Sequence, residues 1–250
     1  MSNTRIAWLS PGDPPGAFPS VERALTEPDG LLAAGGDLSA ARLIEAYTRG
    51  IFPWFDAGQP ILWWSPDPRC VLEPAHYHQS RRFLRSLRNS VTEFSFNADF
   101  AAVIAGCAAP RRSQPGTWIT PDMRDAYAAL HDMGWAHSVE VWRQDELVGG
   151  LYGLAIGRMF FAESMFSRET GGSKTALTAL CRVLEDNAFP LIDCQVASAH
   201  LLTLGATLLS RRRYTAAVTE NTLEREPFTS WPEGRHPARE LAAGTAHQAQ

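Results

Sequence analysis

The sequence predicts an α+β protein built from a small amino-terminal α+β domain and a larger carboxy-terminal domain. Three observations support this prediction. The chain has 250 residues, 45% of them hydrophobic and 10% aromatic, so it can bury a substantial core. Proline and glycine interrupt residues 1–70, which favours short elements there. From residue 121 onward, segments with helical spacing alternate with segments of alternating apolar residues, as in helices that cover an antiparallel sheet.

We divide the chain into four segments by composition. Residues 1–70 form the small domain, with irregular chain up to about residue 30 and an aromatic, proline-rich loop near its end. Residues 71–120 hold a basic helix and a connecting segment, and residues 121–219 form the larger domain. Residues 220–250 are rich in proline, alanine, glycine and histidine, and we expect them to be a loosely ordered tail.

The small domain is predicted to contain a helix and a short strand. Asp37 and Ser39 offer capping side chains before a segment with helical apolar spacing, and Gly50 supplies a stop, which predicts a helix over 40–49. The next segment contains four prolines, which exclude a continuous helix or a central strand. It is therefore expected to be a stiff loop lined by aromatic residues, with a short strand at 61–64.

A basic helix and an apolar helix are predicted in the connecting segment. Arg81, Arg85 and Arg88 recur at helical spacing and therefore share one face. Residues 91–96 alternate like a strand, and residues 99–109 have the composition of a helix. The residues from 110 to 118 contain proline and glycine and are expected to form a loop.

The larger domain is predicted to contain a three-stranded meander between helices. Pro121 opens a helix that Gly134 ends. Apolar runs separated by polar turns then predict three antiparallel strands within 136–167. The remaining elements are a helix that begins at Ser173, a short apolar strand at 190–196, a helix at 200–206 and a last strand within 209–218.

Composition excludes several classes of protein. The four cysteines are widely spaced and form no CxxC pair, so we expect neither a metal site nor a disulfide framework. No apolar run reaches the ~18 residues that a membrane span needs, and we expect a cytoplasmic protein with reduced thiols and no membrane contact. The net charge of −4 gives no global sign of a nucleic-acid partner, and the clusters Arg111-Arg112 and Arg211 to Arg213 are by themselves typical of solvated surfaces.

Two predicted strands carry polar residues that suggest a reaction site. Asp193 and Gln195 bracket Cys194 on a short apolar strand, so their side chains are expected to project to the same face. A structural polar pair is the plain alternative. Glu163 ends the apolar run from Met159, where an ionisable group is costly unless it is paired. A salt bridge to an internal arginine would also explain it.

Several blocks across residues 18–214 resemble the leucyl/phenylalanyl-tRNA–protein transferase family. The combination of GIFPWF, WWSPDPR and LIDCQ in this order is the most specific part, supported by GTWIT, ESMFSR and SKTAL. The chain departs from the family at Gly171 to Lys174 and at Ser198, where small polar residues are kept. Separately, the element order from 121 to 219 resembles the Gcn5-related N-acyltransferase (GNAT) fold, and a fold alone does not determine function.

The resemblance implies an enzyme that transfers Leu, and also Phe and Met, from aminoacyl-tRNA to the amino-terminal Arg or Lys of acceptor proteins. Such products would enter the N-degron degradation route. It implies that Asp193 assists proton removal from the attacking amine or holds it, that Gln195 orients the amine, and that Glu163 recognises the acceptor's cation. Whether Asp193 is a base or an electrostatic anchor stays open at this point. No cofactor is implied, and a monomer is our expectation.

The resemblance also implies a binding role for apolar, aromatic and basic residues. An apolar hollow for the donor side chain would be lined by Leu151, Phe160, Met165, Leu180, Leu184 and Ile192. Residues expected around the terminal adenosine and the aminoacyl group are Trp54, Trp118, Tyr127 and Ser198. Bases stack on aromatic side chains without regard to sequence, as a reader of a universal CCA end requires. Arg81, Arg85 and Arg88 would follow the phosphates of the acceptor stem.

Two other functions are compatible with parts of the sequence. An acetyl-CoA-dependent acetyltransferase would need a glycine-rich loop that opens a helix and holds the pyrophosphate, and residues 168–173 come close to this pattern but miss its last position. A tRNA-binding protein without activity would be expected to lose the carboxylate and amide pair, whereas Asp193 and Gln195 are both present.

Overall fold

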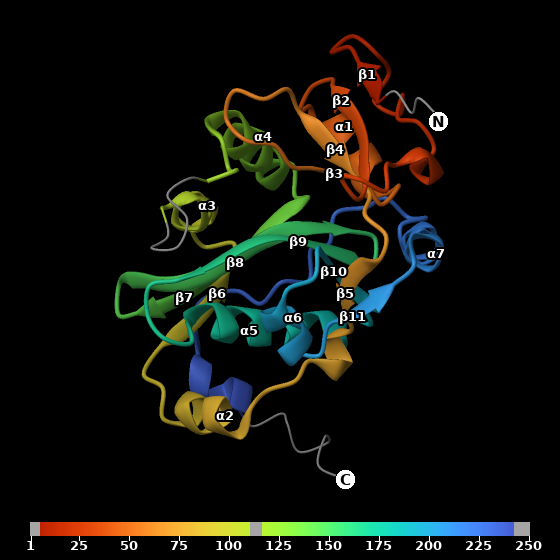
Figure 1. The fold of residues 1–250 in the computed structure, drawn as a ribbon. Coiled ribbons are helices and arrows are strands. Elements are labelled where there is room, and N and C mark those ends of the chain that lie inside the picture. The colour runs from red at the N-terminus through yellow and green to blue at the C-terminus, as the bar shows by residue number, and fades with distance from the viewer. Residues whose placement is uncertain (1–5, 111–116, 243–250) are drawn as a thin grey trace.

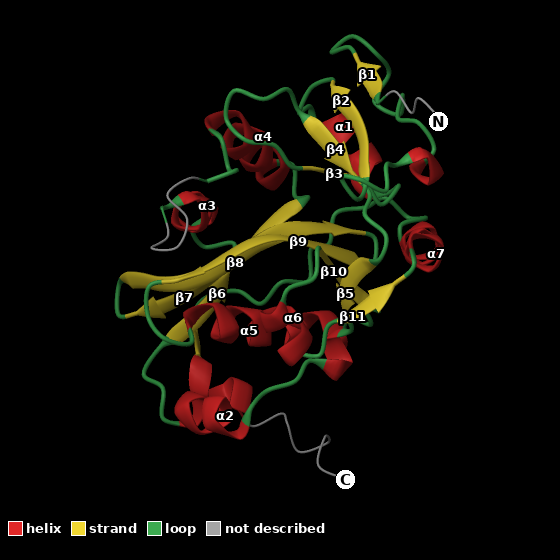
Figure 2. Ribbon diagram, viewed as in Figure 1, coloured by secondary structure: helices red, strands yellow, loops and turns green. Residues whose placement is uncertain are grey.

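The computed structural model describes residues 6–110 and 117–242 of the chain. Within these residues, the strands form a four-stranded sheet and an eight-stranded sheet, and helices lie on both faces of the larger sheet (Figure 1, Figure 2). The predicted α+β class with a small amino-terminal domain is confirmed. The Arg111-Arg112 cluster and the chain ends, residues 1–5 and 243–250, lie outside the described residues.

The small domain consists of the smaller sheet packed against a helix. Its elements are β1 Ala7–Leu9, the 3-10 turn Val21–Arg23, β2 Leu31–Gly35, α1 Ala40–Tyr47, β3 Phe52–Pro53 and β4 Leu62–Trp64. The sheet order is β1-β2-β4-β3, so the proline-containing β3 lies at an edge, where a missing N–H is tolerated. The predicted helix at 40–49 and strand at 61–64 are confirmed. The sequence does not predict β1, β2 or β3. β1 and β3 are only three and two residues long, and β2 is buried along its whole length and shows no alternation.

The large sheet runs in the order β11-β5-β10-β9-β8-β7-β6-β12. Its strands are β5 Arg69–Leu72, β6 Glu93–Phe96, β7 Ala136–Arg143, β8 Glu146–Ile156, β9 Met159–Ser167, β10 Leu191–Gln195, β11 Thr207–Leu209 and β12 His236–Pro237. The predicted meander is confirmed, since β7, β8 and β9 pair antiparallel in sequence order. β10 runs parallel to β9 and antiparallel to β5. Strands from residues 69–96 and from the larger predicted domain therefore share one sheet, and the proposed domain boundaries stay a prediction.

Two layers of helices enclose this sheet. The helices are α2 Arg81–Arg88, α3 Phe100–Ala108, α4 Pro121–Asp132, α5 Gly172–Asp186, α6 Ala199–Thr203 and α7 Arg211–Asn221, with 3-10 turns at Pro74–His76 and Ala238–Ala242. α3 and α4 lie on one face together with the small domain, and α5 and α6 lie on the other face (Figure 1). Each face has its own apolar core. Within the described part of the chain, no helix has the length and apolar character needed to cross a membrane.

The predicted last strand within 209–218 is wrong over most of its length. β11 ends at Leu209, and α7 begins at Arg211. The Ser210 hydroxyl accepts a hydrogen bond from the Arg213 N–H at 3.5 Å and so caps the helix. Tyr214 and Val218 are buried one helical turn apart, and this spacing favours the helix over a strand.

The expectation of a loosely ordered tail does not hold for residues 220–242. The Trp231 ring stacks on Phe96 with a centroid distance of 5.3 Å and lies 4.6 Å from the ring of His137. β12 pairs with β6, and Leu241 is buried in the core beside α5. A few large apolar side chains fix this segment, although its average composition is typical of loosely ordered chain.

Candidate active site

A buried carboxylate joins the small domain to the large sheet. Glu163 lies on β9, and its Oε1 accepts hydrogen bonds from the Tyr47 hydroxyl at 2.6 Å and from Gln195 Nε2 at 2.9 Å. Its Oε2 accepts from the Tyr127 hydroxyl at 3.0 Å. The two tyrosine hydroxyls also lie within hydrogen-bonding distance of each other, so their two O–H protons are shared among three contacts. Four different elements, α1, α4, β9 and β10, therefore converge on one carboxylate.

Burial determines the protonation of this cluster. It raises the pKa of Glu163 to about 7, helped by the charge of Asp193, while the hydrogen bonds from Tyr47, Tyr127 and Gln195 act in the opposite direction. Burial also raises the pKa of Tyr47 and of Tyr127 well above the usual value, so both remain neutral donors. Glu163 therefore changes between its neutral and charged forms near neutral pH.

The hydrogen-bonding capacity of the Asp193 carboxylate is used inside the protein. Arg69 donates from Nε to Oδ1 at 2.8 Å and from Nη2 to Oδ2 at 2.7 Å, which makes a bidentate ion pair. The Tyr214 hydroxyl donates to Oδ2 at 2.7 Å, and the Gln195 N–H donates to Oδ1 at 2.9 Å. Asp193 is 0% exposed. This carboxylate can hold Arg69, Tyr214 and the Gln195 backbone in place, and neither of its oxygens is exposed to solvent.

Asp193 and Gln195 act together through the backbone. The pairing of β10 with β5 shifts register between them, and Gln195 adopts a φ of 62°. This left-handed conformation is uncommon for a residue with a side chain. The hydrogen bond from the Gln195 N–H to Asp193 holds the bulge, which directs the Gln195 amide toward Glu163. The predicted pair is thus brought together, although no side-chain to side-chain bond connects its members.

A small apolar cavity opens where β9 and β10 separate. The two strands pair only from Met159 to Phe161 on β9. Beyond that point lies a cavity of about 120 Å³, and its lining residues are Leu151, Ala162, Glu163, Ser164, Met165, Leu177, Ile192, Cys194 and Leu201. The hydrogen bond between Gln195 and Glu163 spans the opening between the two strands.

Three of the six residues that were predicted to line a donor pocket, Leu151, Met165 and Ile192, line this cavity. Phe160, Leu180 and Leu184 do not line it; they are fully buried in the core on the α5 side of the sheet. Their apolar character therefore has a packing explanation. The pocket residues that sequence reasoning missed are Ala162, Ser164, Leu177, Cys194 and Leu201.

Glu163, Asp193 and Gln195 with their hydrogen-bond partners make up a polar centre. Sequence reasoning missed three of those partners. Tyr47 belongs to the buried face of α1, Arg69 opens the buried strand β5, and Tyr214 lies on the helix that was predicted as a strand. Arg69 offered one signal, because an arginine at the start of a wholly apolar strand needs a buried carboxylate partner. The alternative of an internal arginine next to Glu163 is not what the structure has, since Arg69 pairs with Asp193 instead.

Three other predicted binding residues are not among the hydrogen-bond partners of Glu163. Trp54 is 46% exposed, and its ring lies 5.8 Å from that of Trp64. Trp118 is half-buried against the core near the small domain. Ser198 is exposed and caps α6 by accepting a hydrogen bond from the Leu201 N–H at 3.2 Å. None of these three has a hydrogen bond with the Glu163 cluster among the described residues.

The predicted phosphate-binding arginines share one exposed surface. Arg81, Arg85 and Arg88 all lie on α2 and are all exposed, while Phe83 and Leu87 anchor the helix. α2 lies beyond α5, on the opposite side of the large sheet from α4 (Figure 1). Within the described residues, no ion pair neutralises these three side chains. They form a basic surface separate from the carboxylate cluster.

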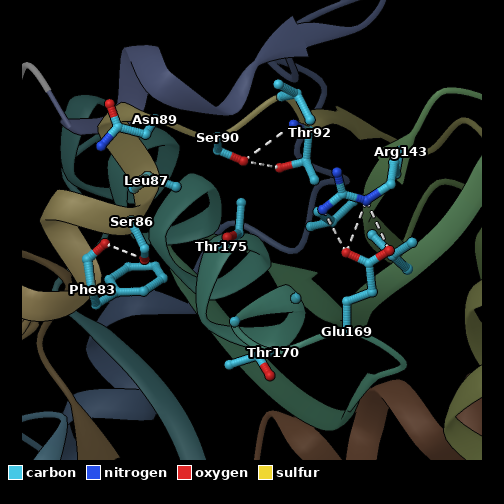
Figure 3. Close-up of a pocket in the computed structure, with 15 residues that line it drawn as sticks. Phe83, Ser86, Leu87, Asn89, Ser90, Thr92, Arg143, Glu169, Thr170 and Thr175 are labelled. Atoms are coloured by element: carbon cyan, nitrogen blue, oxygen red, sulfur yellow. Dashed lines mark hydrogen bonds and ion pairs between the residues drawn. The ribbon is translucent and has the colours of Figure 1, made fainter.

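A larger cavity of about 260 Å³ lies between α2 and the start of α5 (Figure 3). Arg143 and Glu169 form a bidentate ion pair at its edge, with Nε to Oε1 at 2.8 Å and Nη2 to Oε2 at 2.6 Å. The first amides of α5 are already bonded, because the Gly172 N–H donates to the Glu169 carbonyl oxygen at 3.1 Å and the Ser173 N–H donates to Ser167 Oγ at 2.7 Å. These two N–H groups at the start of α5 are therefore not free to bind a ligand.

The family models and the similar curated proteins all point to one family. A family model described as leucyl/phenylalanyl-tRNA protein transferase matches residues 71–219, and a model of the N-terminal domain of the same family matches residues 36–67. A leucyl/phenylalanyl-tRNA–protein transferase from Azoarcus sp. is 54% identical over 226 residues, covering 90% of this chain and 95% of the relative. Those from Xanthomonas campestris and Pseudomonas aeruginosa are 54% and 56% identical, covering 92% and 84% of this chain and 93% and 92% of the relatives.

Solved structures are similar only in outline. The structure of L-PGS from Bacillus licheniformis aligns with a TM-score of 0.40 and 10% identity, covering 75% of this chain and 71% of that chain. A likeness of this size carries no argument about function.

Proposed function

Because the chain belongs to the leucyl/phenylalanyl-tRNA protein transferase family, it is an aminoacyltransferase that acts between tRNA and proteins, and we propose that it transfers Leu, and also Phe and Met, to an amino-terminal Arg or Lys. The observation that supports this assignment best is the apolar cavity lined by Glu163, which accepts a hydrogen bond from Gln195. An aminoacyl side chain fits such a hollow while the ester lies beside the polar pair.

The apolar cavity receives the donor side chain in this proposal. Leu151, Met165 and Ile192 make an apolar wall, and Leu201 of α6 closes the far side. The cavity of about 120 Å³ suits an aliphatic side chain, and a polar side chain would lose its hydration there without finding a partner. Trp54, Trp118, Tyr127 and Ser198 are proposed to contribute to binding of the aminoacyl group and the terminal adenosine. The exposed Trp54 offers a face for stacking, and the fully buried Tyr127 acts through its hydrogen bond to Glu163.

Gln195 is proposed to contact the acceptor amine. Its Nε2 donates to Glu163, so the amide has one defined orientation and its Oε1 remains available as an acceptor. The amine nitrogen attacks the ester carbonyl carbon, the new C–N bond forms, and the bond from that carbon to the terminal ribose oxygen breaks. The proton that the amine loses ends on the ribose oxygen. No covalent enzyme intermediate is required.

Asp193 acts as an electrostatic anchor in this mechanism and not as the base. Its four hydrogen bonds from Arg69, Tyr214 and the Gln195 N–H leave no oxygen that faces the cavity. Its contribution is to hold the bulge that presents Gln195. A rigid support of this kind places the reacting groups within a fraction of an ångström.

Glu163 supplies the negative charge that an acceptor with amino-terminal Arg or Lys needs. Its hydrogen-bond partners Tyr47, Tyr127 and Gln195 are all neutral, so its charge in the ionised form is not cancelled by a cation. A cation of the acceptor would provide that compensation. Products of this reaction would enter an N-degron route in the cytoplasm, and the enzyme would work as a monomer.

Arg81, Arg85 and Arg88 are proposed to bind phosphates of the tRNA acceptor stem. Support comes from their common exposed surface on α2 and from the lack of a neutralising ion pair in the described chain. The larger domain is further proposed to have a GNAT-like fold. The order of a helix, a three-stranded meander, a helix and a parallel strand from α4 to β10 supports this comparison.

The first test measures transfer of labelled leucine from charged tRNA to a peptide that begins with Arg. Gln195→Ala should lower the rate by about 100-fold, whereas Gln59→Ala, at an exposed loop, serves as the matched control and should leave it unchanged. Peptides that begin with Lys or with Ala measure the acceptor preference. Transfer that ribonuclease abolishes supports the proposal, and equal transfer to the Ala peptide contradicts the predicted preference for a cation.

An acetyl-CoA-dependent acetyltransferase is the alternative that the same assay examines. That reaction would use free amides at the start of α5 for the pyrophosphate, and two of these amides are bonded to Glu169 and Ser167. Acetylation of the peptide from labelled acetyl-CoA, without leucine transfer, would overturn the proposal. Binding of tRNA without transfer to any peptide would favour a protein that binds tRNA and has no activity.

A further inference from the structure

Two cysteines meet across β5 and β10 beside the cavity. Cys70 of β5 is the register partner of Gln195, and Cys194 occupies the bulge immediately before Gln195. Both side chains lie on the α5 side of the sheet, where Cys70 belongs to the buried core and Cys194 packs against it. The two thiols are close enough to shift each other's pKa, with that of Cys70 lowered and that of Cys194 raised. Neighbouring strands place such a pair within the Cα separation that a disulfide can span.

The two thiols differ in access. Cys194 is half-buried and lines the apolar cavity, whereas Cys70 is 0% exposed. A small oxidant that enters the cavity therefore meets the Cys194 sulfur first and finds Cys70 behind it. Cys107 and Cys181 are buried elsewhere and line no part of this cavity.

We propose that Cys70 and Cys194 form an oxidant-sensitive thiol pair whose reversible disulfide switches off the aminoacyl cavity. This inference rests on the proposed function of the cavity. A disulfide in a cytoplasmic protein is commonly a transient, redox-sensing bond, and a pair beside a functional cavity matches that use. The thiol state described above is the active form, and the bridged state is inactive.

The oxidant is a hydroperoxide, and the reaction balances in two steps. The Cys194 sulfur attacks the distal oxygen of hydrogen peroxide, an S–O bond forms, the O–O bond breaks, and water leaves. The Cys70 sulfur then attacks the Cys194 sulfenic acid, an S–S bond forms, the S–O bond breaks, and the hydroxyl leaves as a second water with the Cys70 proton. Two thiols are oxidised by two electrons, and one peroxide is reduced to two waters.

The first proton goes to the leaving oxygen of the peroxide, which departs as water. The interaction between the two thiols lowers the pKa of Cys70, and the same interaction together with burial raises the pKa of Cys194. Cys194 therefore loses its proton only as it attacks the peroxide. Because the cavity-facing thiol is seldom ionised by itself, the reaction is expected to be slow and to need excess peroxide.

Bridging would disturb the groups on either side of Cys194. The new bond draws the Cys194 sulfur from the cavity wall toward β5, and Gln195 is the next residue along the bulge. The Gln195 amide would then move away from Glu163, whose hydrogen bond at 2.9 Å fixes its direction. A misplacement of about 1 Å at a reacting group can cost about 100-fold in rate.

The test begins with the unmodified protein and needs no activity. The full chain is treated with excess hydrogen peroxide, free thiols are blocked with a maleimide, and peptides are mapped by mass spectrometry without reduction. We expect a Cys70 to Cys194 linkage that dithiothreitol removes. Absence of this linkage while both thiols remain free, or a linkage that joins other cysteines, would overturn the proposal whatever the transfer assay shows.

The second arm measures leucine transfer after the same treatment. Transfer should fall by about 100-fold and return with dithiothreitol. Cys70→Ala keeps the cavity thiol but cannot bridge. After peroxide followed by arsenite, which reduces sulfenic acids and leaves disulfides intact, its transfer should survive, whereas that of the unmodified protein should stay low. Cys181→Ala, which removes a buried thiol outside the pair, is the matched control and should lose transfer as the unmodified protein does.

These arms separate the inference from the proposed function. Linkage with full transfer would show that the bridge forms but does not act as a switch, which overturns the inference and leaves the transferase assignment intact. Linkage in a protein that transfers no leucine before oxidation would instead count against the proposed function, because the peptide map does not depend on it.

Discussion

Asp193→Ala is expected to lower the free energy of unfolding by about 3–5 kcal/mol, because it leaves the Arg69 guanidinium buried without its carboxylate. The Arg69 and Asp193 side chains are 1% and 0% exposed, so water cannot replace the lost partner. Arg69 would keep the Gly50 carbonyl oxygen, 3.1 Å from Nη1, and the ring faces of Phe52 and Tyr214. Such a loss is large against a typical unfolding free energy of about 5–15 kcal/mol.

The assay is a double-mutant cycle that follows urea unfolding by tryptophan fluorescence. Arg69→Met should cost a similar amount, because it leaves the Asp193 carboxylate buried with a charge and no cation. The double variant Arg69→Met, Asp193→Ala removes both charges and closes the cycle, and its loss should be smaller than the sum of the two single losses by about 2 kcal/mol or more. A double variant whose loss equals the sum of the two single losses would contradict the ion pair as the source of the effect.

Leucine transfer, measured at low temperature where the variants are folded, separates an anchor from a base. An anchor predicts that the double variant loses about 100-fold in rate, since the Gln195 N–H has lost its acceptor. It also predicts that Arg69→Met is impaired, although this variant keeps the Asp193 carboxylate. The result that would refute the reasoning is an Asp193→Asn variant that is folded at the assay temperature and binds charged tRNA normally but transfers no leucine, because asparagine can still accept from Gln195 but cannot take a proton.

Three further predictions concern pH, salt and the carboxy-terminal segment. Burial raises the pKa of Glu163 from 4.5 to about 7, so between these values the folded protein binds a proton that the unfolded chain has lost. Stability therefore falls as pH rises through this window, by about 3 kcal/mol in all, and Glu163→Gln should remove that part of the slope when urea unfolding is compared at about pH 5 and about pH 8. Replacing Arg81, Arg85 and Arg88 by glutamine should raise KM for charged tRNA and reduce the slope of log KM against log salt by about 2–3, with no change in thermal unfolding. Trp231→Ala should lower the free energy of unfolding by about 2–4 kcal/mol in urea, whereas a loosely ordered tail would give no change.

The predicted elements that hold are those with a local signal. α4 begins at Pro121 and the helix at 40–49 begins after Ser39, because capping groups and apolar spacing lie within one short stretch of chain. β2 and α7 were missed or misassigned for the opposite reason. β2 is buried throughout and lacks alternation, and Tyr214 has a β-favouring side chain on what proves to be a helix. Tertiary packing outweighs such preferences.

The residues that make the polar centre were only partly visible in the sequence. Asp193, Gln195 and Glu163 were found because a short motif and an isolated carboxylate in an apolar run are local features. Arg69 and Tyr214 donate hydrogen bonds to the Asp193 carboxylate, and they lie 124 and 21 residues from it along the chain. No spacing rule connects residues at such distances, so their roles required the three-dimensional structure.

The sequence by itself determined the class of fold, most of the helices of the larger domain and the family resemblance, and it singled out Asp193 and Gln195 as candidate site residues. The tertiary structure alone decided that β9 and β10 part to form a cavity, that Phe160, Leu180 and Leu184 belong to the core, and that Asp193 is held by Arg69. The physical reason is that capping and periodicity depend on neighbours along the chain. Burial, charge pairing and the opening between two strands depend on which distant segments come into contact.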